Sequence, residues 1–237
     1  MHPFISIIIP AKNESKWLPL CLKAVLDLDY PRDRYEIIVV DNGSTDNTVE
    51  LAKKFGANVF IQPDLNISGL RNYGASVAKG SVFAFIDADV VVSKGWLLAA
   101  ANCLKLNKDI GCAGSFPLVP KEFGWVAKSW WCLQYPGGTS PEYEVQWLPS
   151  MNMIVTKEAF NSVGGFSTDL ITCEDVDFCY RLGKRFKIMY CKDIQAIHYG
   201  EPQSLMHLFK KERWRGLSNY DGIKHHGVRS DGFFRLY

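Results

Sequence analysis

Two aspartates stand inside an otherwise apolar run, "FAFIDADVVV", which covers residues 83–92. A buried carboxylate costs several kcal/mol unless it is paired or bound to a cation. If Asp87 and Asp89 lie on a strand, both side chains point to the same face of the sheet, because side chains alternate between faces. Two hard oxygen ligands on one face favour Mg²⁺ or Mn²⁺ that carries substrate phosphates. The alternative is a pair of ordinary turn residues at the end of a strand.

A second acidic cluster, "CEDVDF", stands at the start of a helix predicted over residues 174–185. The cluster contains Glu174, Asp175 and Asp177. The positive end of the helix dipole stabilises a negative charge in the first helical turn by roughly 0.3–1 kcal/mol. On physical grounds alone, capping of the helix is therefore sufficient to explain the three acids.

The first hundred residues alternate between short apolar runs and segments with helical periodicity. Strands are predicted over residues 4–10, 35–41, 57–62 and 82–87, and the helices between them include residues 17–28, 44–56 and 68–80. Such alternation predicts a parallel sheet with right-handed crossovers and helices on both faces. Sites in such sheets lie beyond the carboxyl ends of the strands, where residues 10–14, 41–44 and 87–89 all fall. These three polar clusters should therefore meet at one edge of the sheet.

The alternation weakens after Gly95. A helix over residues 95–107 and strands over 110–116, 151–156 and 194–200 are predicted before and after the helix at 174–185. Residues 123–147 form an aromatic segment that contains a strong loop signal, "YPGGTSP". Neither an internal repeat nor a linker is evident. We therefore expect one domain with two halves, residues 1–94 and 95–202, followed by a C-terminal part, residues 203–237.

The composition is that of an ordinary globular protein, with 47% hydrophobic and 22% charged residues among 237. The net charge of +2 gives no reason to expect a nucleic-acid partner. Residues 203–237 hold seven Lys/Arg against three Asp/Glu, a local charge of +4. Such a basic segment either binds phosphates or an anionic membrane surface, or is a solvated tail. No run approaches the roughly 20 apolar residues of a membrane span, although the chain could be part of a longer, membrane-anchored protein. The seven cysteines never form Cys-x-x-Cys, so we expect reduced core residues in a cytoplasmic protein.

The usual glycine-rich phosphate-binding loops are absent from the sequence. "PAKNES" follows the first strand where a Rossmann dinucleotide site has Gly-x-Gly-x-x-Gly, and no Walker Gly-Lys-Ser/Thr occurs. Five blocks instead resemble family 2 glycosyltransferases of the GT-A fold in order and spacing. The blocks are "SIIIPAKNE", "EIIVVDNGSTDNT", "LRNYGASVAKG", "FAFIDADV" and "GGFSTDLITCEDVDFCYRL", within Phe4 to His198. The resemblance implies an α/β fold of GT-A type, a single domain with a Rossmann-like, mostly parallel central sheet and helices on both faces.

The resemblance also implies a nucleoside-diphosphate sugar as donor, with UDP as the expected nucleotide, and Mn²⁺ or Mg²⁺ as cofactor. Asp41 and Arg71 would contact the base, Asp87 would face the ribose, and Asp89 would bind the metal with His198 as a further ligand. The nucleotide pocket would be lined by loop residues Pro10, Ala11, Asn13 and Glu14. Taken singly, Asp41 is also explained as a helix cap, Arg71 as a surface residue and His198 as a structural histidine.

In the same family pattern, Asp175 is the general base. Its carboxylate would take the proton from the acceptor hydroxyl as that oxygen attacks the anomeric carbon, with inversion of configuration. Contacts to the acceptor are expected, less specifically, from Glu174, Trp130, Trp131, Asn152, Arg213 and Trp214. Core packing also explains the aromatic residues. "KKERW" departs from the Gln-x-x-Arg-Trp of processive members at Lys210, which argues against processive polymerisation.

We therefore expect an inverting, metal-dependent glycosyltransferase with a nucleotide-binding first half and a second half for the acceptor and catalysis. The acceptor would be a glycan or a lipid-linked sugar in bacterial or archaeal cell-envelope assembly. The protein would be cytoplasmic, with peripheral contact to the inner face of the cytoplasmic membrane through its basic end. Two alternatives stay open. A sugar nucleotidyltransferase would need a basic, glycine-rich loop after the first strand, and a non-catalytic nucleotide-sugar-binding protein would show no turnover.

Overall fold

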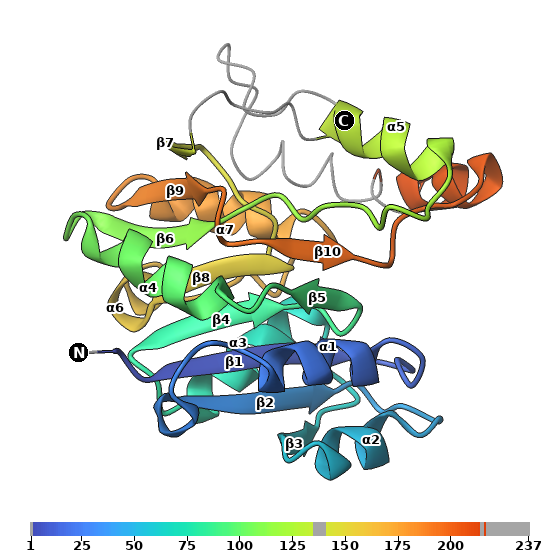
Figure 1. The fold of residues 1–237 in the computed structure, drawn as a ribbon, viewed down its shortest axis with the longest axis horizontal. Helices are drawn as coiled ribbons and strands as arrows, with labels where there is room; N and C mark the ends of the chain where they lie inside the picture. Colours follow the sequence, from blue (N-terminus) through green and yellow to red (C-terminus); the bar gives the residue numbers. More distant parts are fainter. Residues whose placement is uncertain (1, 135–140, 214–215, 217–237) are drawn as a thin grey trace.

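One eight-stranded sheet runs through the computed structural model, which describes residues 2–134, 141–213 and 216 (Figure 1). Its strand order is β3-β2-β1-β4-β8-β6-β9-β7, and within the same residues β5 and β10 form a separate antiparallel pair. The strands are β1 Ile5–Ala11, β2 Tyr35–Asp41, β3 Asn58–Ile61, β4 Val82–Ile86, β5 Val90–Val92, β6 Ile110–Gly114, β7 Glu142–Glu144, β8 Asn152–Thr156, β9 Lys187–Cys191 and β10 Ala196–His198.

Half of the sheet is the parallel array that the sequence predicts. β3, β2, β1 and β4 are parallel neighbours. β8 then runs antiparallel to both β4 and β6, and β6 and β9 are again parallel. β7 lies antiparallel to β9 at the far edge. The predicted fold class, a single α/β domain with a mostly parallel central sheet, is confirmed.

Helices cover both faces of the sheet and bury two separate cores (Figure 1). On one face lie α1 (Leu18–Leu26), α2 (Thr48–Lys54) and α4 (Trp96–Lys105), and on the other lie α3 (Ile67–Val77), α6 (Lys157–Ser162) and α7 (Glu174–Leu182). The pleat of β1 separates the cores, because Ile7 and Ile9 face the first core and Ile8 faces the second. Outside this layered part stand α5 (Trp125–Gln134) and the helical residues 205–213.

The structure departs from the predicted elements in several places. Asp87 and Asp89 lie in the turn between β4 and β5, so the argument that a strand directs both to one face was wrong. The aromatic segment contains helix α5, and the short strands β5, β7 and β9 were not predicted. The loop predicted from "YPGGTSP" lies outside the described residues except for Pro141, and so does most of the C-terminal part beyond residue 213.

One pair of cysteines is oxidised, contrary to the expectation of reduced thiols throughout. Cys103 on α4 and Cys191 at the end of β9 form a disulfide. Both side chains are buried in the first core, where α4 packs against β9, and no spacing in the sequence reveals that contact. The free cysteines are Cys21, Cys112, Cys132, Cys173 and Cys179.

Candidate active site

A cavity of about 310 Å³ lies at the carboxyl ends of β1 and β4. It is at the edge of the sheet where the sequence places the polar clusters. Four of the predicted nucleotide residues line the cavity, namely Pro10, Ala11, Glu14 and Asp87, together with the predicted metal ligand Asp89. Lys12 belongs to the same predicted loop, and six further lining residues were not predicted, namely Asn42, Leu65, Asn66, Ile67, Leu70 and Ala88.

Two other predicted nucleotide residues shape the neighbouring loops instead of lining the cavity. Asn13 has a φ of 56°, its Oδ1 accepts a hydrogen bond from the Thr45 N–H at 2.8 Å, and its own N–H donates to Ser44 Oγ at 2.8 Å. Asp41 is fully buried, and its carboxylate accepts hydrogen bonds from the N–H and the hydroxyl of Ser44. These bonds fasten the loop after β1 to the loop after β2. The contact of Asp41 with a nucleotide base stays a prediction.

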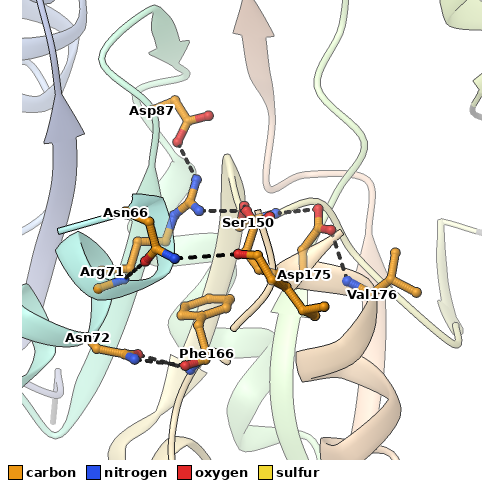
Figure 2. A network of polar contacts seen from close by, with 11 residues as sticks. Asn66, Arg71, Asn72, Asp87, Ser150, Phe166, Asp175 and Val176 are labelled. Carbon is orange, nitrogen blue, oxygen red and sulfur yellow. Dashed lines mark hydrogen bonds and ion pairs between the residues drawn. The ribbon is translucent and has the colours of Figure 1, made fainter. Parts of the chain in front are cut away.

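Arg71 joins two motifs that are far apart in the sequence (Figure 2). Its Nη2 donates to Asp87 Oδ1 at 2.7 Å and its Nη1 donates to Glu174 Oε1 at 2.8 Å. The side chain is only 2% exposed, so the interpretation of Arg71 as a surface residue was wrong. Its guanidinium is engaged by two carboxylates and does not line the cavity, and its contact with a nucleotide base stays a prediction. Asp87 and Glu174 therefore lie within the reach of one guanidinium.

Asp175 lies in the first turn of α7 beside this bridge (Figure 2). Its Oδ2 accepts from the Ser150 N–H at 3.3 Å and its Oδ1 accepts from the Val176 N–H at 2.9 Å. Burial and the negative charge of Glu174 raise the pKa of Asp175 to about 7, against the lowering effect of Arg71. A carboxyl group that titrates near neutral pH is suited to accept a proton from a substrate. The bond to Ser150 also fixes the carboxylate to a segment outside α7, which capping of the helix does not require.

Helix α3 holds the loop that leads into α7 (Figure 2). Asn66 caps α3 by accepting from the Gly69 N–H at 2.9 Å, and its Nδ2 donates to the Thr168 carbonyl at 2.7 Å. Asn72 pairs with the main chain of Phe166, donating to its carbonyl at 2.8 Å and accepting from its N–H at 2.9 Å. Two neighbouring residues of the block "LRNYG" therefore hold distant segments together. Asn72 holds the loop before α7, and Arg71 binds Asp87 and Glu174 of the two acidic motifs.

Asp89 and His198 come together because β5 and β10 pair in antiparallel register, with His198 opposite Val90. Asp89 Oδ2 lies 3.2 Å from His198 Nε2. Burial would raise the pKa of Asp89, but the hydrogen bond and positive charge of His198 lower it. Burial would lower the pKa of His198, but its hydrogen bonds to Asp89 and Glu201 raise it to about 9. The two predicted metal ligands thus form an ion pair in the structure.

The donor atoms of these two groups are of types that bind a small divalent cation. A Cβ atom added at Gly200 would collide with Asp89 Oδ2 and His198 Nε2, so only glycine lets the backbone pass this close to them. Within residues 2–134, 141–213 and 216, no three His, Cys, Asp or Glu side chains form a ready-made metal site. A site with one carboxylate and one imidazole suits Mn²⁺ or Mg²⁺ that takes its remaining ligands from substrate phosphates and water.

The predicted acceptor residues have mixed surroundings. Asn152 is fully buried, and its amide bonds Ser115, Ile194 and Trp96, so its assignment to the acceptor is corrected to a role in the core. Trp130 and Trp131 are half-buried on α5, and Trp131 Nε1 donates to a carbonyl at 2.5 Å. Arg213 is exposed at the end of the helical residues 205–213, and Trp214 lies outside the described residues.

Sequence reasoning missed the residues that support the predicted ones. Glu201 accepts from His198, Asn72 and Asn66 hold the loop before α7, and Gly200 lets the backbone pass close to Asp89. Their only sequence signal is position, since Asn72 follows the predicted arginine and "GE" follows "HY". Neither signal indicates a role without the contacts.

Comparison with known proteins shows the family and the fold of the chain. Residues 6–180 match the model of glycosyl transferase family 2. The chain is 28% identical over 210 residues to glycosyltransferase AglE of Haloferax volcanii, an alignment that covers 84% of this chain and 68% of AglE. It is 27% identical over 198 residues to the beta-monoglucosyldiacylglycerol synthase of a Nostoc species, covering 76% of this chain and 41% of the synthase. The chain therefore spans less than half of that synthase.

A solved structure shows the same fold. The mannosyltransferase PcManGT from Pyrobaculum calidifontis, solved in complex with GDP-Man and Mn²⁺, superposes with a TM-score of 0.71 at 17% identity, covering 94% of this chain and 65% of that chain. The family match runs from β1 to α7 and includes the Asp87 and Asp89 turn, the Arg71 bridge and Asp175. The chain belongs to glycosyl transferase family 2.

Proposed function

We propose that this glycosyltransferase moves a sugar from a nucleoside-diphosphate sugar, with UDP as the nucleotide, to a hydroxyl of a lipid-linked or glycan acceptor. The proposed transfer inverts the anomeric carbon and depends on a divalent cation. The observation that carries the proposal is the bridge from Asp87 through Arg71 to Glu174, with Asp175 next to it. The bridge supports the proposal because it brings the segment of Asp87 and Asp89 and the segment of Asp175 to one edge of the sheet.

Asp89 and His198 would hold the cation, and the cavity between the loops after β1, β2 and β4 would receive the nucleotide. When bound, the cation would neutralise negative charge on the departing nucleoside diphosphate. Mn²⁺ in the PcManGT complex supports a divalent cation here, and the choice between Mn²⁺ and Mg²⁺ is left to the assay.

Asp175 would perform the proton transfer. Its carboxylate takes the hydroxyl proton of the acceptor while the oxygen lone pair forms a bond to the anomeric carbon. The bond from that carbon to the diphosphate oxygen breaks, and its electron pair leaves with the nucleoside diphosphate. One carboxylate is sufficient for this single displacement, and the new bond forms on the face opposite the leaving group. A general base of this kind typically contributes about 10²–10⁴-fold to the rate.

A lipid-linked acceptor and peripheral membrane contact are supported by two observations. The Nostoc relative is named for a glycosylated diacylglycerol. The helical residues 205–213 expose Leu205, Met206 and Phe209 beside Lys210 and Arg213. None of the described helices is long and apolar enough to cross a bilayer, so we propose contact with the surface of the membrane.

A pair of variants separates donor binding from chemistry. We expect Mn²⁺ together with UDP to raise the melting temperature of the wild type more than UDP with EDTA does, because the diphosphate and Asp89 share the cation. Asp89→Ala should lose the metal-dependent part of this shift. Asp175→Asn should keep the shift and lose about 10²–10⁴-fold in the release of UDP from UDP-sugars in the presence of diacylglycerol or prenyl-linked acceptors.

The outcomes distinguish the open alternatives. Equal stabilisation by UDP with EDTA and with Mn²⁺ would contradict the metal site. Transfer by Asp175→Asn within threefold of the wild type would contradict the base, and helix capping would then explain this aspartate. A larger shift with GDP than with UDP would reassign the nucleotide. The anomeric configuration of the product, read by NMR, tests inversion directly.

A further inference from the structure

We propose that Glu201 is a positioning residue that directs His198 toward the cation and, through Lys211, ties the helical residues 205–213 to the metal site. The inference rests on the proposed metal site formed by Asp89 and His198. It assigns a role to a carboxylate that does not line the cavity, and to a helix that follows the family-matched region.

The carboxylate of Glu201 divides its two oxygens between two partners. Oε1 lies 2.8 Å from His198 Nδ1, and Oε2 accepts from Lys211 Nζ at 3.0 Å. Glu201 is 4% exposed and His198 is 6% exposed, so the bond between them is buried, whereas the bond to Lys211 is partly buried. When Nδ1 carries a proton and donates it to a carboxylate, the lone pair of the neutral ring is on Nε2. Nε2 is the nitrogen that faces Asp89, as a metal ligand requires.

Stability alone is a weak reason for such an arrangement. Burying two carboxylates and a histidine removes charged groups from water, and well-packed apolar residues commonly serve stability as well or better. The adjacent Gly200 also lets the backbone pass beside Asp89 and His198, because any side chain at this position would collide with the two donor atoms. Both features are explained if the segment from His198 to Glu201 is built to receive a cation.

The carboxylate of Glu201 also binds Lys211, which lies on the helical residues 205–213. The helical residues 205–213 begin after Ser204, whose Oγ accepts from the His207 N–H at 3.2 Å (orange-red in Figure 1). This helix exposes Leu205, Met206 and Phe209, so few apolar contacts fix it. A cation that fixes His198 also fixes Glu201 and hence Lys211. By linkage, binding of the cation and docking of the helix should stabilise each other.

Four variants separate the two tasks of Glu201. Glu201→Ala removes both hydrogen bonds, whereas Glu201→Gln keeps an acceptor for His198 but loses the charge that attracts Lys211. Lys211→Met breaks the tie to the helix alone. Lys210→Met is the matched control, because it removes a lysine from the same helix whose side chain is exposed. The readouts are Mn²⁺ affinity with saturating UDP, measured by electron paramagnetic resonance of free Mn²⁺, and amide hydrogen exchange of residues 205–213 without metal.

We expect Glu201→Ala to bind Mn²⁺ about tenfold or more weakly, the scale of change when a group behind a metal ligand is removed. Glu201→Gln should recover most of that affinity. In Glu201→Ala, Glu201→Gln and Lys211→Met alike, residues 205–213 should exchange at least about threefold faster than in the wild type, because the helix opens locally. Lys210→Met should match the wild type in both readouts.

Mn²⁺ affinity of Glu201→Ala within threefold of the wild type would overturn the positioning role. Equal exchange in Lys211→Met and Lys210→Met would overturn the tie to the helix. If Glu201→Ala does not fold, Glu201→Leu takes its place, because leucine refills the space and accepts no hydrogen bond. A wild type that takes up no Mn²⁺ with UDP would refute the proposed metal site, and the positioning role with it. Hydrogen exchange, which needs no metal, would still decide whether Glu201 and Lys211 hold the helix.

Discussion

Asp175 holds its proton more tightly than an ordinary aspartate. This raised pKa suits proton transfer near neutral pH, but it also makes the stability of the fold decrease as the pH rises. Burial and the charge of Glu174 raise its pKa to about 7. Near neutral pH, the ionised fraction can accept a proton from an acceptor hydroxyl. The folded protein also binds this proton more tightly than the unfolded chain does. The resulting stabilisation is complete below the ordinary pKa of 3.8 and is lost as the pH rises through about 7.

The first prediction at the residue scale follows from the direction of this pKa shift. We expect the free energy of unfolding of Asp175→Asn, minus that of the wild type, to increase from pH 4 to about pH 7 and then to level off, because asparagine does not titrate. The increase should be about 1.4 kcal/mol for each unit by which the pKa is raised. The altered hydrogen bonds to Ser150 and Val176 add an offset that is the same at every pH. Urea denaturation across this range measures the difference.

Exposed Asp193→Asn serves as the control for the general effect of removing one acidic group. A difference between Asp175→Asn and the wild type that stays constant with pH would contradict the raised pKa.

Gly200 gives a second prediction at the residue scale. An added Cβ would occupy the space in front of Asp89 and His198, so Gly200→Ala should weaken Mn²⁺ binding in the presence of UDP by about tenfold or more, as disturbances around a metal ligand do. The φ of Gly200 lies outside the left-handed region, so the backbone itself tolerates alanine. Gly124→Ala is the matched control, because its Cβ would meet no atom within 4 Å. Titration with Mn²⁺ measures the effect, and equal affinity in both variants would refute this reading of the glycine.

The sequence indicated the candidate site residues, but it did not indicate the residues that hold them in position. Asp87 and Asp89 stand out because acids are rare in apolar runs, whereas Asp175 stands out only because its block resembles the family pattern. Gly200 and Glu201 follow a short strand without any periodic pattern, and their role depends on contacts with distant segments. The interior role of Arg71 was missed because a charged residue on a helix is exposed by default.

At the scale of elements, α3 organises the site. Through Arg71 it holds Asp87 in the turn after β4 and Glu174 at the start of α7, and through Asn72 it holds the loop before α7. The turn belongs to the first half of the chain and α7 to the second. Helix α3 therefore contributes to the position of Asp175 at the start of α7 relative to Asp87 in the turn after β4.

Arg71→Met tests this role of α3. We expect a loss of about 3–5 kcal/mol in the free energy of unfolding, the range for breaking one partner out of a buried ion pair. The loss should fall toward the lower end, because the side chain of Asp87 is 28% exposed. Lys94→Met is the control, since its pair with Asp27 is 65% and 63% exposed and should contribute less than about 1 kcal/mol. Urea denaturation gives both values. Unchanged stability with weaker UDP binding would instead restore Arg71 as a contact to the base.

Elements were predictable where their signals were long and periodic. The four strands of the parallel array follow from apolar runs bounded by turn residues. Helices α3 and α7 follow from helical periodicity. β5, β7 and β9 have three to five residues each and are recognised only by their partners, β10 and β6 among them. The turn at Asp87 to Asp89 agrees with the alternative of turn residues at the end of a strand, whereas β5 was missed because "VVV" continues the apolar run beyond the two acids.

At the scale of the whole molecule, the two halves share one sheet, in which β8 from the second half lies between β4 and β6. The predicted separation at residue 94 therefore does not correspond to a break in the sheet. The alternation of the first hundred residues was sufficient to predict the parallel half. The pairing of β8 between two strands requires contacts across about 70 residues of sequence, which local patterns do not reveal.

The helical residues 205–213 carry exposed apolar side chains, and this is the surface that we expect to contact a membrane. Leu205, Met206 and Phe209 are 61%, 65% and 66% exposed, and they share one side of the helix because successive residues turn by about 100°. Lys210 lies next to this side of the helix, and Arg213 lies within it, one turn after Phe209. Apolar side chains flanked by basic ones are typical of helices that lie in the headgroup region of a bilayer.

The last prediction is that the protein cosediments with vesicles containing an anionic lipid at low salt and less so at high salt, because screening weakens the attraction of basic residues to anionic headgroups. Replacing Leu205, Met206 and Phe209 together by serine should remove most of the binding that persists at high salt. The control variant replaces Leu20 and Leu26 of α1 by serine, since both are also exposed but lie on a different helix. Equal binding by both variants would place the contact elsewhere. Absence of binding at both salt concentrations would refute membrane contact, and the basic helix would then be better explained as a support of the metal site through Lys211.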